Sequence, residues 1–128
     1  MATIHDVIID ARHPASLARF WAAALDGYEV APYDDAELAR LRSLGVDDPE
    51  DDPTVLVEAP GRTPRLWLVR VPEPKTVKNR VHLDLRADDP EAEAARLEAL
   101  GATRCAEQPN DDVIAFLDPE GNELCLLR

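Results

Sequence analysis

The sequence predicts an α+β fold of two βαβββ modules, because the same order of elements occurs twice along the chain. In each half an apolar strand leads into a helix that begins at a proline, and a later pair of strands encloses a turn rich in proline and glycine. The 128 residues are 45% hydrophobic, which is enough for a packed core without disulfide bonds. We expect one domain over 1–128, with a first module over 1–71 and a second over 78–128.

The first module begins with an apolar strand at 6–11 and continues into a helix at Pro14, which suits a first helical turn. Apolar residues recur at helical spacing behind this proline, and Gly27 marks the end of the helix. Leucines at positions 38, 41 and 44 predict a short inserted helix near 35–44. The remaining expected strands of this module are 28–31, 55–59 and 65–69.

The second module repeats this order after a proline-rich linker at 72–76. Its first strand runs into Asp89, which can cap a helix, and Pro90, which begins it. Gly101 then marks the helix end. The remaining expected strands of this module are 103–107, 113–117 and 123–127.

The net charge argues against two classes of partner, and the cysteine content bears on the location of the protein. Acidic residues outnumber basic ones 26 to 14, for a net charge of −12, so the surface repels phosphate backbones and anionic lipid. We therefore expect neither a nucleic-acid nor a membrane partner, and we expect the acidic run at 47–53 to be a solvated loop. The two cysteines form no disulfide framework, and the N-terminus has no signal-peptide pattern, so a cytoplasmic protein is predicted.

Residues 78–85 alternate like a strand with two unlike faces. One face is apolar and carries Val81, Leu83 and Leu85. The other carries His82 and Asp84, which are residue types that bind ligands and perform acid–base chemistry. Asp84 either orients His82 as a general base or forms an ion pair with Arg86 or Arg65, since charges in a folded protein need partners.

Four segments together resemble the vicinal-oxygen-chelate superfamily, and more closely its glyoxalase-like proteins. They are FWAAALDG at 20–27, KNRVHLDL at 78–85, RLEALGA at 96–102 and DPEGNE at 118–123. The resemblance implies that the two modules pair into a cup-shaped, mostly antiparallel sheet with helices outside and a ligand inside. It also implies a small-molecule ligand and a homodimer, as is frequent in the superfamily.

The resemblance further implies that alternate residues of the strands face the ligand. His82 and Asp84 are then the expected catalytic residues. Trp67 either offers a stacking wall to an aromatic or cationic ligand or fills space. The expected ligand-binding residues are Asp6, Arg65, Trp67, Glu123 and Cys125.

Metal-dependent members of the superfamily place one ligand on the first strand and one on the last strand of each repeat. The aligned positions here hold Asp6, Trp67, His82 and Cys125. Because tryptophan has no lone pair for coordination and the usual His/Glu quartet is absent, we expect no cofactor. A divalent metal, if bound, would be held by Asp6, His82 and Cys125 with an open position, as in three-ligand zinc sites.

These observations predict a glyoxalase-like small-molecule-binding protein. The leading hypothesis is a metal-independent lyase or isomerase that acts on a polar carbonyl compound. One alternative is a non-catalytic drug-binding protein of the resistance type, to which an acidic surface and Trp67 would suit a cationic drug. A second alternative is a metal-dependent glyoxalase-like enzyme.

Overall fold

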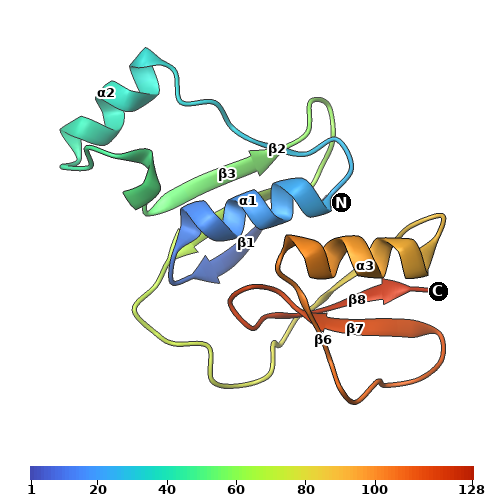
Figure 1. Ribbon diagram of the computed structural model, residues 1–128. Helices are drawn as coiled ribbons and strands as arrows, with labels where there is room; N and C mark the ends of the chain where they lie inside the picture. Colours follow the sequence, from blue (N-terminus) through green and yellow to red (C-terminus); the bar gives the residue numbers. More distant parts are fainter. The chain divides into compact units, whose positions relative to one another are not determined.

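The computed structural model describes residues 1–128 and resolves them into two compact units, Met1–Pro74 and Lys75–Arg128 (Figure 1). Each unit contains one predicted module, and the boundary lies in the predicted linker. The first unit contains β1 (Asp6–Ala11), α1 (Pro14–Ala24), β2 (Glu29–Val30), α2 (Asp35–Ser43), a 3-10 turn η1 (Pro49–Asp51), β3 (Thr54–Glu58) and β4 (Arg65–Arg70). The second contains β5 (Leu83–Arg86), α3 (Pro90–Leu100), β6 (Thr103–Arg104), β7 (Val113–Leu117) and β8 (Glu123–Leu127). The α+β class and the βαβββ repeat are confirmed.

Both units contain a four-stranded sheet of the same topology. The strand orders are β1-β4-β3-β2 and β5-β8-β7-β6, and in each sheet the first and last strands of the unit pair in parallel. Ile8 lies opposite Trp67 in one sheet, and Asp84 lies opposite Cys125 in the other. This register confirms the alignment in which Trp67 matches Cys125 and in which Asp6, two residues before Ile8, matches His82. The pairing of both modules into one cup stays a prediction.

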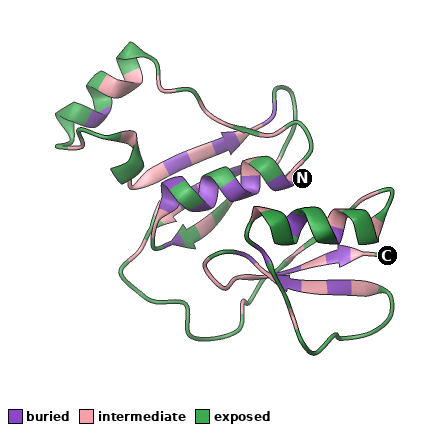
Figure 2. Ribbon diagram, in the orientation of Figure 1, coloured by how far each residue is buried: buried purple, intermediate pink, exposed green.

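Each sheet buries one face and leaves the other partly open. In β4 and β8 the buried residues are Leu66, Leu68, Leu124 and Leu126, each at most 2% exposed. Helix α1 contacts β2, β3 and β4 in the first unit, and α3 contacts β6 and β8 in the second. Figure 2 shows the resulting alternation of buried and half-buried residues along β3 and β7. Each buried leucine contributes roughly 1.5–3 kcal/mol, and this burial sets which residues remain on the open face.

Both long helices begin at the predicted prolines, and α3 also ends at its predicted glycine, whereas α1 ends at Ala24, three residues before Gly27. Asp89 caps α3 by accepting a hydrogen bond from the Ala92 backbone N–H at 3.0 Å. Gly101 ends α3 with a φ of 117°, a left-handed conformation that a residue with a Cβ rarely adopts. Helix α2 confirms the predicted insertion. No α-helix of the chain has the length and apolar character needed to cross a membrane.

Two expectations from the sequence are wrong. Val81 is 77% exposed rather than part of the apolar face, because the ladder between β5 and β8 begins only at Leu83. Asp52 is 2% exposed although it lies in the acidic run that was expected to be solvated. Its carboxylate accepts hydrogen bonds from the Tyr33 hydroxyl at 2.8 Å and the Thr54 backbone N–H at 2.9 Å, which compensate its desolvation.

The turn between β7 and β8 depends on Asp118, which is 3% exposed. Its carboxylate accepts hydrogen bonds from the Glu120 and Asn122 backbone N–H groups at 2.9 and 3.0 Å and from the Asn122 side chain at 2.9 Å. We predict that Asp118→Ala lowers the local free energy of unfolding of β7 and β8 by about 2–4 kcal/mol, because three part-buried donors lose their shared acceptor. Native-state hydrogen exchange of those strands measures this change. Asp111→Ala, at an exposed position of the same unit, is the matched control, and equal effects of the two substitutions would contradict the assignment.

Candidate functional site

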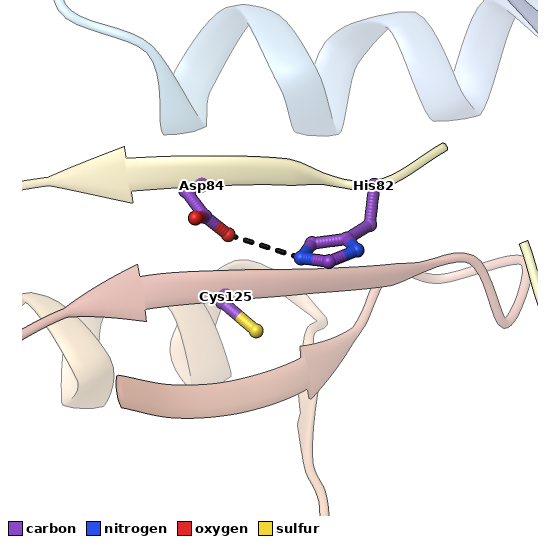
Figure 3. A group of neighbouring side chains, drawn as sticks. All are labelled: His82, Asp84 and Cys125. Carbon is purple, nitrogen blue, oxygen red and sulfur yellow. Dashed lines mark ion pairs between the residues drawn. The ribbon is translucent and has the colours of Figure 1, made fainter. Parts of the chain in front are cut away.

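The open face of the second sheet gathers His82, Asp84 and Cys125 (Figure 3). Asp84 belongs to β5, and His82 lies two residues earlier, so their side chains leave the same side of the chain. Cys125 belongs to β8 and is the direct register partner of Asp84. The parallel ladder between these strands therefore brings an imidazole, a carboxylate and a thiol together.

His82 and Asp84 are in direct contact. The His82 Nε2 atom lies 3.2 Å from Asp84 Oδ1, and the two side chains are 43% and 48% exposed. Of the partners that the sequence allowed for Asp84, the structure pairs it with His82, whereas Arg65 is bound to Asp6 and Arg86 forms no ion pair with Asp84. The contact favours the tautomer that carries its proton on Nε2, which leaves the Nδ1 lone pair free to accept a proton.

Cys125 is a neutral thiol in this setting. Burial raises the pKa of Cys125, the charges of Asp84 and Cys105 raise it further, and Lys78 acts in the opposite direction. A thiol whose pKa is raised is a poor nucleophile because little of it is ionised near neutral pH. Cys125 is thus better suited to shaping the site than to attacking a substrate.

The same three side chains have the chemistry of a metal-ligand set. Their nitrogen, oxygen and sulfur donor atoms all lie within 4.8 Å of one another, and three protein ligands with an open position are typical of catalytic zinc. Binding of a divalent metal by these donors would displace the proton of the Cys125 thiol. The donor set fits a divalent metal with Asp84 in the place where the sequence suggested Asp6. Both Asp6 oxygens are already bound by Arg65.

Glu123 is bound within its own unit. Its carboxylate accepts a hydrogen bond from the Asn79 backbone N–H at 3.0 Å and forms an ion pair with Lys75 at 3.2 Å. These contacts hold the segment before His82 against the start of β8. A direct role of Glu123 in ligand binding stays a prediction.

The open face of the first sheet is organised around Arg65. Its guanidinium donates to both carboxylate oxygens of Asp6 at 2.7 and 2.9 Å, and it lies 5.7 Å from the centre of the Trp67 ring. Hydrogen bonding to Arg65 lowers the pKa of Asp6 to about 2, against a smaller opposing effect of burial. Asp6, Arg65 and Trp67 therefore form one connected group on this face.

Trp67 also lines a pocket of about 780 Å³ in the first unit, which the sequence did not reveal. Tyr33 and the buried Asp52 take part in its lining. Asp52 looked like one of several solvated acidic residues because its partner, Tyr33, is distant in sequence. A tyrosine between an apolar strand and a helix N-terminus carries too little pattern to identify such a contact.

Comparisons with known proteins agree on the fold. The sequence profile of a family described as "Glyoxalase-like domain" matches residues 6–127. A solved structure named oxidase ChaP-H2 is 23% identical, with a TM-score of 0.62 over 98% of this chain and 92% of that chain. A glyoxalase/bleomycin resistance protein/dioxygenase family enzyme from Burkholderia phytofirmans PsJN is 17% identical, with a TM-score of 0.64 over 98% and 97%. A glyoxalase/bleomycin resistance protein from Albidiferax ferrireducens T118 is 21% identical, with a TM-score of 0.57 over 98% of both chains. No curated protein matches this chain.

The Asp6–Arg65 pair generates a prediction about pH. Because folding lowers the pKa of Asp6 to about 2, the ionised carboxylate stabilises the first unit above its unfolded pKa. That stabilisation is lost as the pH falls through about 2.

We predict that Arg65→Met raises the pKa of Asp6 toward its ordinary value, as followed by NMR of the side-chain carboxyl carbon. His5→Ala is the control and should have a smaller effect, because Arg65 is the dominant cause. An unchanged titration in Arg65→Met would refute the assignment.

Proposed function

The chain belongs to the glyoxalase-like domain family of the vicinal-oxygen-chelate superfamily, and we propose that it acts on a small polar carbonyl compound as a metal-independent lyase or isomerase. The 3.2 Å contact between His82 and Asp84 on an open sheet face carries this proposal. It supplies a histidine base with a carboxylate that orients it, which is a common arrangement in proton transfer. His82 is the catalytic base, and Asp84 is the positioning residue.

In the proposed step, His82 Nδ1 removes a proton from the carbon beside the carbonyl. The electron pair of the broken C–H bond forms the C=C bond of an enolate, and the imidazole becomes an imidazolium that Asp84 stabilises. Return of the proton to a neighbouring atom completes an isomerisation. Loss of a leaving group from the adjacent carbon, with its bonding electrons, completes an elimination, and the leaving group takes the proton from the imidazolium so that His82 returns to its neutral form. The positive charge of Lys78, which acts on the neighbouring Cys125, would favour the developing negative charge of the enolate.

Non-catalytic binding is the alternative that the same fold allows. A resistance-type binding protein would need the open faces for recognition but would not need His82 as a base. Deuterium exchange at the carbon beside the carbonyl separates the two functions, because only a base catalyses it. The homodimeric assembly and the cytoplasmic location expected from the sequence stay predictions.

We predict that the protein catalyses this exchange in at least one member of a panel of small hydroxyketones and 2-oxo acids in deuterated water, as followed by proton NMR. His82→Gln should slow exchange by about a hundredfold or more, and Asp84→Asn by about tenfold, because they remove the base and its orientation respectively. Cys125→Ser should retain exchange. A protein that binds a panel member without exchanging its proton would be a non-catalytic binder.

The His82, Asp84 and Cys125 cluster supports a metal-dependent enzyme as a second candidate. A metal bound there would supply Lewis-acid polarisation of the carbonyl oxygen. This candidate predicts that Co²⁺ added to the purified protein gives a thiolate-to-metal absorption band in the near ultraviolet. The band should vanish in Cys125→Ser and persist in Cys105→Ser, the matched control. Absence of the band, together with no stoichiometric zinc after zinc is supplied, would eliminate the metal-dependent candidate.

A further inference from the structure

The pocket of the first unit is lined by residues of that unit alone, and none of them belongs to the His82 cluster. Its volume of about 780 Å³ lies within the range of pockets that hold small organic molecules. Helix α2 and the segment before it form one wall, and the open face of β3 and β4 forms the other. Because α2 is absent from the second unit, this pocket is a feature of the first unit alone.

The sheet wall of the pocket is mainly apolar. Leu56 and Trp67 are register partners on neighbouring strands, so their side chains lie next to each other on the same face. Arg65 lies near the Trp67 ring and is itself held by Asp6. Leu56 and Trp67 thus offer adjacent apolar side chains to a bound molecule.

The Tyr33 hydroxyl offers the pocket an acceptor rather than a donor. The Tyr33 hydroxyl donates its proton to Asp52 at 2.8 Å, and its oxygen retains lone pairs for a further hydrogen bond. Burial is the largest cause that raises the pKa of Tyr33, and its hydrogen bond to Asp52 raises the pKa further. The hydroxyl therefore keeps its proton. A ligand group that meets Tyr33 must therefore be a donor.

The net charge of the pocket lining also favours a ligand that carries a hydrogen-bond donor. Three acidic residues, Asp34, Glu37 and Asp52, line the pocket together with one basic residue, Arg40. Arg40 donates to both oxygens of Glu37 at 2.9 and 2.6 Å, so its charge is already compensated. The remaining excess is negative, which favours a cation and disfavours an anion.

We propose that this pocket binds a small organic amine. The protonated nitrogen donates to the Tyr33 hydroxyl oxygen beside Asp52, and the apolar part of the ligand lies on Leu56 and Trp67. Helix α2 thereby acts as the specificity element of the first unit. This site does not depend on the proton-transfer chemistry proposed for His82.

Three probes of the same shape test the charge preference. Benzylamine, benzyl alcohol and benzoate are titrated into the full chain at constant ionic strength and followed by tryptophan fluorescence and by calorimetry. Trp67 is the reporter, because Trp21 is only 2% exposed in the core. We expect benzylamine to bind about tenfold or more tightly than the other two, as the gain of a charge-assisted hydrogen bond implies.

Two pairs of variants test the location. Tyr33→Phe should weaken benzylamine binding about tenfold by removing the acceptor, whereas Tyr28→Phe, whose hydroxyl donates to the Pro64 carbonyl at 2.7 Å, should not. Ala36→Trp should abolish binding by filling the pocket from α2, whereas Ala39→Trp, on the same helix but outside the lining, should not. Both alanines are exposed, so these variants retain the fold.

The proposal is overturned if benzylamine binds no more tightly than benzyl alcohol, or if Ala36→Trp binds it as well as the unsubstituted protein. It is also overturned if none of the probes binds at millimolar concentration, because the pocket would then be only a solvent-filled gap beneath α2. Deuterium exchange measured on the same preparations reports on His82 separately. Failure of the amine site and failure of the proposed enzyme function are therefore distinguishable.

Discussion

The parallel pairing between the first and last strands of each unit determines where the polar groups lie. It places Arg65 beside Asp6 in one sheet and Cys125 beside Asp84 in the other. Because successive side chains point to opposite faces, burial of the leucines in β4 and β8 directs their neighbours to the open face. A shift of one residue would bury the charged groups and expose the leucines. In each unit, the burial of these leucines therefore fixes which side chains lie on the open face of the sheet.

The two units use this common topology for different electrostatics. In the first, Asp6 binds Arg65 through both oxygens, and the Arg65 guanidinium lies 5.7 Å from the centre of the Trp67 ring. In the second, Asp84 meets a half-exposed histidine at 3.2 Å, and its ion pair is with that histidine rather than with an arginine. A compensated ion pair is suited to holding a surface in shape, whereas an oriented imidazole is suited to moving a proton. The same strand geometry thus holds an ion pair in one unit and a histidine–carboxylate contact in the other.

Much of the fold followed from local patterns, because its main signals lie close together in the sequence. Pro90 and Gly101 bound α3 as expected, and the strand alternation placed His82 and Asp84 on one face. Contacts between distant residues were harder to predict. The burial of Asp52 depends on Tyr33, 19 residues away, and the exposure of Val81 depends on where the ladder with β8 begins. Which residues pair with a charged side chain depends on the tertiary structure, and the pairing cannot be read from a single sequence.

The equivalence of positions in the two sheets also bears on how such a chain can evolve. Asp6, Ile8 and Trp67 occupy the places that His82, Asp84 and Cys125 occupy in the other unit. In a chain with an internal duplication, these positions can mutate without altering the strand ladders, because their side chains lie outside the helix-packed core. One copy can therefore preserve an ancestral activity while its twin accumulates changes. The insertion of α2 into only one copy makes the divergence difficult to reverse by a single substitution.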